Sequence, residues 1–203
     1  MKHIKNYLFI SIFLLININY SDHSYARSTN EIDASIDNAL ERFIDEIQGS
    51  EGYLDGAKGV LVIPRMIKAG VVLGMEYGEG ALIVDGVKIQ YYRAFSTSLG
   101  LQIGVGAKDL VILFFDNDAM DDFIYSSGWQ AGVDGAIALF TMGLGGSIDT
   151  TESQDPIVGF VFGHKGIIAG VSLEGTKFTK IFPDSDNESD LEDIQEFNEA
   201  ALD

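Results

Sequence analysis

Residues 58–84 constrain the fold of this chain more than any other stretch. Aliphatic side chains that favour β-strands are interrupted there by repeated glycines, and Pro64 falls among them. Glycines between short apolar runs are typical of turns and of strands whose backbones approach closely. The pattern predicts a strand at 57–63 that Pro64 ends or places at an edge. A short turn or helical piece at 65–68 and strands at 71–77 and 81–84 follow.

The rest of the chain predicts more strands than helices. Asp85-Gly86 between two apolar runs predicts a two-residue hairpin turn, and residues 87–95 are expected to form the second strand of that hairpin. Further strands are expected at 99–105 and 109–115, twice within 132–148, as a hairpin of 156–163 and 167–173, and at 177–182. Trp129, the single tryptophan, is expected to be half-buried.

Two segments have helical patterns. Residues 28–47 repeat apolar side chains at spacings of three and four, with Ser28 and Glu31 in the positions of a capping box. Residues 117–126 predict a short second helix. Together these elements indicate an α+β fold: a curved, mostly antiparallel, barrel-like sheet packed with an N-terminal helix and one short internal helix.

The two ends of the chain differ in composition from the middle. Lys2 and Lys5 precede an apolar run at 7–16, and small residues stand at Ser24 and Ala26, which is the pattern of a signal peptide. We expect residues 1–26 to be removed after Ala26 and the protein to be exported, periplasmic or secreted; the alternative is a retained anchor helix. Residues 27–183 would form one domain. Residues 184–203 hold nine acids and no Lys or Arg, so they are expected to be a mobile acidic tail.

Several classes of function are excluded or disfavoured by residue content. The chain has no Cys, and His164, expected in a hairpin turn, is the only His after Ala26, so neither a Cys nucleophile nor a His-rich metal site can be built there. Ser172 is not in a nucleophile elbow, because the second glycine is one place too far. No glycine pattern matches a nucleotide loop. A net charge of −18 argues against nucleic acid as a partner. We therefore expect no enzyme activity, no metal and no cofactor.

Basic residues are the remaining candidates for a site. Lys and Arg side chains beside backbone N–H groups at glycine turns can hold a phosphate. Arg65 and Lys68 are three residues apart and would share a face if that piece is helical. The candidates for binding a lipid head group are Lys58, Arg65, Lys68, Arg93 and Lys165. The alternative is that they are solvated surface charges.

Ordered blocks of sequence resemble the SYLF domain family, also called the Ysc84 actin-binding or DUF500 domain. The resemblance runs from the N-terminal helix to about Phe182 and is carried by several blocks together: 58–64, 68–70, Gly74, 77–80, 99–104, 110–114, 119–123, 132–134, Gly166 and 170–176. It implies a lipid-binding module, since eukaryotic members bind phosphoinositide membranes and some bind actin filaments. Bacterial members are mostly exported or lipid-anchored.

The sequence thus predicts an exported, non-enzymatic protein of this family that contacts membrane lipid peripherally through phospholipid head groups. The binding residues come from charge and spacing and are not transferred from the family. An actin partner is not expected for an exported protein. The alternative is a structural or protein-interaction module of the cell envelope, with a protein partner and no lipid ligand.

Overall fold

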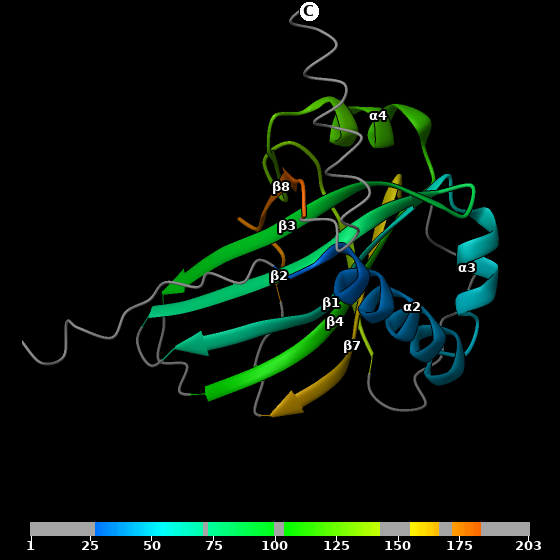
Figure 1. Ribbon diagram of the computed structural model, residues 1–203. Coiled ribbons are helices and arrows are strands. Elements are labelled where there is room, and N and C mark those ends of the chain that lie inside the picture. Colours follow the sequence, from blue (N-terminus) through cyan, green and yellow to red (C-terminus); the bar gives the residue numbers. More distant parts are fainter. Residues whose placement is uncertain (1–26, 71–72, 100–103, 143–154, 167–171, 184–203) are drawn as a thin grey trace, which may run out of the picture.

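The computed structural model describes residues 27–70, 73–99, 104–142, 155–166 and 172–183. In these residues eight strands form one curved sheet in the order β5-β8-β3-β2-β1-β4-β7-β6 (Figure 1). The strands are β1 (Gly59–Gly70), β2 (Leu73–Val84), β3 (Val87–Leu99), β4 (Gly104–Phe114), β5 (Trp129–Gln130), β6 (Ala138–Thr141), β7 (Ile157–Gly166) and β8 (Lys177–Ile181). The helices are α2 (Thr29–Glu46), α3 (Ser50–Gly56) and α4 (Asn117–Tyr125). Neighbouring strands are antiparallel except β6 and β7, so the predicted α+β class and curved, mostly antiparallel sheet are confirmed.

Helix α2 covers one face of the sheet, as its amphipathic pattern predicts. The Ser28 hydroxyl accepts a hydrogen bond from the backbone N–H of Glu31 at 3.3 Å and caps the helix. The apolar stripe is fully buried against the sheet, and the ring of Phe43 lies 5.3 Å from those of Phe160 and Phe162. The buried residues of the stripe are Ile32, Ile36, Ala39 and Phe43. The short helix α3, which the sequence pattern did not predict, follows it and adds Tyr53 to the same core.

Helix α4 packs on the opposite face. Asp116 caps it by accepting the backbone N–H of Ala119 at 2.9 Å, and Phe123 points into a second core. Trp129 is only 2% exposed, so the expectation of a half-buried tryptophan was wrong. Its ring is 5.5 Å from that of Phe123 and 6.0 Å from that of Phe178, because β5 pairs with β8 and carries the indole under α4.

The prediction of a turn or helical piece at 65–68 was also wrong. β1 continues through this segment, with a bulge between Ile63 and Met66 that shifts its register against β4. Pro64 has no N–H to give to the ladder, and Arg65 takes a left-handed conformation with φ of 51°. The bulge accommodates both residues, so a proline stands in a central strand and not at an edge.

The strands predicted on either side of residues 78–80 are one continuous strand, β2. Its glycines permit close approach to β1: a Cβ on Gly80 would lie 1.7 Å from the carbonyl oxygen of Val62. The hairpin turn at Asp85-Gly86 is confirmed, since both residues have positive φ, 51° and 77°, as a type I′ turn requires.

His164 lies within β7 and not in a turn, which corrects another expectation. The predictions for residues 1–26, 71–72, 100–103, 143–154, 167–171 and 184–203 lie outside the described residues, including the signal peptide and the acidic tail. Of the two strands expected within 132–148, the described part contains β6. Among the helices of the described residues, none is long and apolar enough to cross a membrane.

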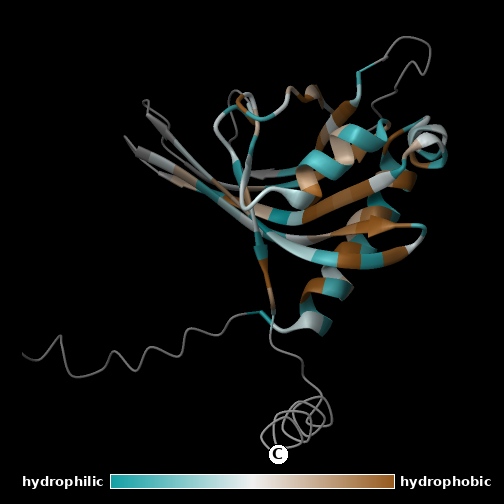
Figure 2. Cartoon of the chain, turned by 90° about the horizontal axis from the view of Figure 1, so that it is seen from above, coloured by the Kyte–Doolittle hydropathy of each residue, from teal (hydrophilic) through white to brown (hydrophobic). Residues whose placement is uncertain are grey.

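The helices cover only part of the sheet. Figure 2 shows apolar residues concentrated in the half of the molecule that lies between the helices, whereas the other ends of β1 to β4 project beyond it. The half of these strands beyond α2 therefore leaves side chains exposed on the α2 side of the sheet.

Candidate functional site

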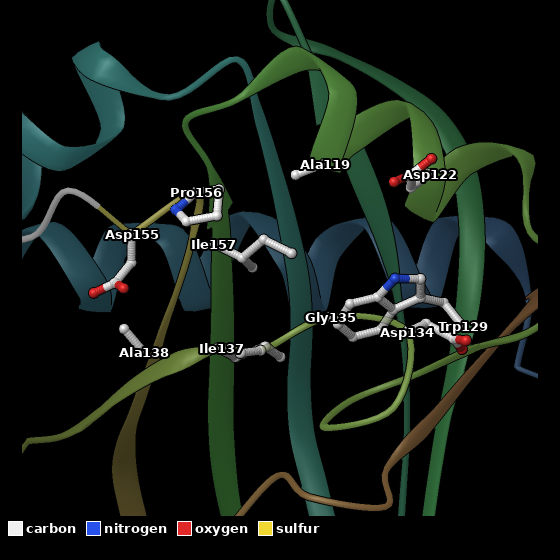
Figure 3. Close-up of a pocket in the computed structure, with 11 residues that line it drawn as sticks. Ala119, Asp122, Trp129, Asp134, Gly135, Ile137, Ala138, Asp155, Pro156 and Ile157 are labelled. Carbon is white, nitrogen blue, oxygen red and sulfur yellow. The ribbon is translucent and has the colours of Figure 1, made fainter.

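A cavity of about 300 Å³ lies between α4, β5 and the start of β7 (Figure 3). Trp129, Ile137 and Ile157 form its apolar wall, and three carboxylates, Asp122, Asp134 and Asp155, line it. Figure 3 shows Asp155 on the side away from the other two. The Asp134 carboxylate accepts the backbone N–H of Gln130 at 2.7 Å, a loop contact. No group of three metal-ligating side chains occurs in the described ranges, and this cavity does not define a metal centre.

A second feature is an exposed apolar row on the projecting half of the sheet. Ile67 of β1 pairs with Tyr77 of β2, and Tyr77 pairs with Phe95 of β3. Directly paired residues of antiparallel strands share a face, so the three side chains stand in one line on the α2 side. Met75, two residues from Tyr77, joins them. All four are between 40% and 50% exposed.

Cations extend this row. Arg93 is two residues from Phe95 on the same face, and Lys177 of β8 pairs with Phe95. The exposed side chains Ile67, Met75, Tyr77, Arg93, Phe95 and Lys177 are called the Tyr77 surface below. It joins apolar area to positive charge, the combination that contacts the interface of a membrane or an apolar, acidic protein segment.

Arg93 is held in place by a small network. Its Nη2 lies 3.4 Å from Oε1 of Glu79, its guanidinium carbon lies 5.5 Å from the centre of the Tyr77 ring, and the Tyr77 hydroxyl donates to the same Glu79 carboxylate. Burial, and then the hydrogen bond to Glu79, raise the pKa of Tyr77 above its ordinary value. Burial lowers the pKa of Arg93, but Tyr77 and Glu79 outweigh it, so the net shift is upward.

The charges of this pair differ in exposure. The Glu79 side chain is only 6% exposed, whereas the Arg93 side chain is 48% exposed. The acid therefore lies beneath the surface and the cation lies upon it. Although the whole chain is acidic, this region presents positive charge to its surroundings.

Arg65 lies beside the Tyr77 surface in the bulge of β1, and a buried aspartate organises this bulge. Asp109 accepts the backbone N–H of Arg65 at 2.9 Å on one oxygen and Nη2 of Arg42 from α2 at 2.6 Å on the other. The opposite strand contributes Gly163, with φ of 61°, where a Cβ would come within 2.4 Å of the Asp109 carboxylate. Arg42 is partly exposed and the Arg65 side chain is exposed, so this site again buries the acid below arginines.

Lys68 has a different environment. It pairs across strands with Glu76, which alternation puts on the face opposite to Tyr77. Its Nζ lies 3.3 Å from one oxygen of Glu76, while Nζ of Lys108 lies 2.7 Å from the other. Lys108 is 1% exposed, and Lys68 and Glu76 are largely buried. Lys68 therefore belongs to an internal ion cluster and does not share a face with the Tyr77 surface.

The predicted basic residues are thus divided among several places. Lys58 is exposed just before β1, at the end of the strand away from the Tyr77 surface; its backbone N–H bonds the Phe114 carbonyl at 2.7 Å. Lys165 pairs with Ala107, which pairs with Ile67 on its other side, so the register places Lys165 in the same cross-strand row as Ile67, two strands away. Arg65 and Arg93 lie on the projecting half of the sheet. Spacing in the sequence did not identify Lys177, which lies beside Phe95 because β8 pairs with β3 in this register.

These observations define the protein as an α+β domain with one curved sheet and one exposed patch, the Tyr77 surface, that combines apolar and basic side chains. Residues 95–188 match the family model for Ysc84, described as "Las17-binding protein actin regulator". The chain is therefore similar to the Ysc84 family over these residues, and the resemblance to the SYLF domain family is confirmed there. No curated protein is similar enough to the chain to count as a match. The matched region holds Phe95 and Lys177 and begins after Arg93.

Proposed function

We propose that this protein is a non-enzymatic lipid-binding member of the Ysc84 family, and that the Tyr77 surface makes peripheral contact with phospholipid head groups. The observation that supports this most is the line of exposed apolar side chains in register across β1, β2 and β3, with Arg93 and Lys177 in the same patch. Arg and Lys at the edge of an apolar patch neutralise phosphates while the apolar groups enter the interface.

The acidity of the chain restricts this contact but does not prevent it. At physiological salt, charges more than about 8 Å apart in water are largely screened. The attraction between a membrane and the projecting half of the sheet therefore depends on the charges at that half. There the acids Glu79 and Asp109 are buried and the neighbouring arginines are more exposed. Helix α2 lies on the same side of the sheet, so its acidic outer side limits the area of such a contact.

Vesicle flotation tests the proposal. The full chain is expected to float with vesicles of mixed phosphatidylcholine and anionic phospholipid. The double substitution Arg93→Gln with Lys177→Gln removes two cations worth about 1 kcal/mol each near such a surface, so binding should weaken by roughly 30-fold. Arg93→Lys keeps the charge and should retain most of the binding.

The apolar part needs its own variant and control. Ile67→Ser with Phe95→Ser should reduce flotation with both anionic and neutral vesicles, because it removes apolar side chains from the contact. Tyr125→Ser on α4 changes a side chain that is even more exposed, at 81%, but far from the patch, and Lys58→Gln removes an exposed cation at the other end of β1. Both controls should float like the unchanged chain. If no vesicle retains the protein, lipid binding is wrong.

A protein ligand on the same surface is the second candidate. An exposed apolar row with basic neighbours also fits a partner protein, and the family description names Las17 binding and actin regulation. Sedimentation with actin filaments, compared between the full chain and Ile67→Ser/Phe95→Ser, tests this directly. For a protein exported after cleavage near Ala26, we expect no sedimentation with actin and an envelope protein as the alternative partner.

A further inference from the structure

The chain itself contains a segment whose chemistry complements the Tyr77 surface. Residues 184–203 carry nine carboxylates and no Lys or Arg, and their apolar residues Leu191, Ile194 and Phe197 recur every three residues. The Tyr77 surface carries Arg93 and Lys177 beside four exposed apolar side chains. The segment 184–203 and the Tyr77 surface therefore carry opposite charges, and both contain apolar side chains.

The topology places the start of that segment near the surface. β8 runs antiparallel to β3, with Lys177 opposite Phe95 and Ile181 opposite Tyr91. Four residues of strand span about 13 Å, so the chain leaves β8 roughly that far from Phe95. A chain of 20 residues can extend to about 65 Å, and as a coil its ends would be about 25 Å apart. The segment is therefore long enough to reach every residue of the Tyr77 surface.

We propose that residues 184–203 bind the Tyr77 surface of their own chain and compete there with any anionic ligand. Tethering gives the segment an effective concentration in the millimolar range, so even weak contacts would occupy the surface for much of the time. A ligand then binds only by displacing the segment. The competition rests on the proposed lipid contact, but binding of the segment does not.

The first experiment contains no lipid. In a tail-neutral full chain, all nine acids of 184–203 are replaced by the corresponding amides, which leaves every described element unchanged. A synthetic peptide of residues 184–203 is titrated onto this chain and onto the unchanged chain, with NMR detection of Ile67, Met75 and Phe95. The peptide should shift these signals in the tail-neutral chain and bind the unchanged chain about tenfold more weakly, because the tethered segment occupies the surface there.

Control variants test whether the peptide binds through charge at the Tyr77 surface. Arg93→Gln with Lys177→Gln, introduced into the tail-neutral chain, should weaken peptide binding, whereas Lys58→Gln should not. A peptide carrying amides in place of the nine acids should not bind. Peptide binding that is equal in both chains, or that shifts signals only away from the Tyr77 surface, overturns the proposal. So does dimerisation of the tail-neutral chain through this surface, because the occupant would then be a second copy.

The vesicle arm separates the two proposals. The tail-neutral chain should bind anionic vesicles more tightly than the unchanged chain, and added peptide should inhibit that binding. If the peptide binds the Tyr77 surface but no vesicle does, the lipid proposal fails and the intramolecular contact stands. If vesicles bind and the peptide neither binds nor competes, the intramolecular contact fails alone.

Discussion

The carboxylate of Asp109 is the most informative single group to change, because it joins α2 to the bulge of β1. One oxygen accepts the Arg65 backbone N–H at 2.9 Å and the other accepts Nη2 of Arg42 at 2.6 Å. Asp109→Asn keeps an oxygen for the Arg65 N–H and loses the charged partner of Arg42. A hydrogen bond to a charged group is worth about 1.5–3 kcal/mol. Arg42 is 39% exposed and is rehydrated when the bond is lost, so we expect a cost of about 1–2 kcal/mol.

Asp109→Ala should cost more, about 2–4 kcal/mol, because it also leaves the N–H of Arg65 without its acceptor. For a chain of this length each kcal/mol lowers Tm by about 2–4 °C. Thermal unfolding should therefore show Tm values that fall in the order unchanged chain, Asp109→Asn, Asp109→Ala. An alanine variant as stable as the unchanged chain would refute the role assigned to this carboxylate.

His164 provides a readout of charge that does not depend on stability. Burial and then the nearby Lys108 ammonium lower the pKa of His164, while the Asp109 carboxylate raises it. Asp109→Asn should therefore lower the pKa of His164 further, and Lys108→Gln should raise it. An NMR titration of the imidazole, assigned with His164→Asn, measures both. A pKa that moves upward in Asp109→Asn would contradict the electrostatic reasoning, whatever happens to Tm.

Three further predictions concern buried groups and close backbone contacts. Tyr92→Phe removes a buried hydroxyl that has no hydrogen-bond partner within the described part of the chain, so its free energy of unfolding in urea should rise by up to about 1–2 kcal/mol. Tyr91→Phe should lower the free energy of unfolding by about as much, because the Tyr91 hydroxyl donates to a carboxylate of α2 at 2.9 Å. A change of the same sign in both variants would be inconsistent with this account. Burial raises the pKa of Tyr92 to about 12 from 10.0, so above pH 10 the folded state keeps a proton that the unfolded state loses. The stabilisation from this group is complete below pH 10 and should disappear between pH 10 and about 12. The free energy of unfolding should therefore fall less steeply with pH in Tyr92→Phe. Gly80→Ala places a methyl group against the Val62 carbonyl and should cost more stability than the roughly 1–3 kcal/mol of ordinary overpacking. Gly86→Ala has open space around it and should cost only about 1–2 kcal/mol, for its positive φ. Equal Tm values for the two variants would show that β1 and β2 separate easily.

The structure explains why some sequence predictions failed. Residues 65–68 follow Pro64 and contain two cations, and local rules assign such a segment to a turn. The strand continues because β2 and β4 bond β1 on both sides, while a bulge accommodates Pro64 and the left-handed Arg65. Trp129 follows a loop and looked half-buried, but pairing of β5 with β8 places it against aromatic rings from distant parts of the chain. In both cases contacts between residues far apart in sequence overrode the local pattern.

The site shows the same division. Charge and spacing selected Arg65, Lys68 and Arg93 together, but strand alternation puts Lys68 on the face opposite to Arg93, in an ion cluster with Lys108. The register between strands decided which apolar residues lie side by side, and no local pattern specifies it. Lys177 could be assigned to the surface only once β8 was known to pair with β3.

The sequence by itself determined the α+β class, the helix at 28–47 with its cap, the Asp85-Gly86 turn and the resemblance to the Ysc84 family. These depend on interactions within a few residues, or on blocks whose order along the chain is sufficient. Only the tertiary structure decided that β1 passes unbroken through Pro64, and that the exposed half of the sheet brings Ile67, Tyr77 and Phe95 into one line. The physical reason is that the choice of neighbouring strands sets both the pairing register and the burial of acids beneath arginines. That choice depends on contacts between residues that are distant in the sequence.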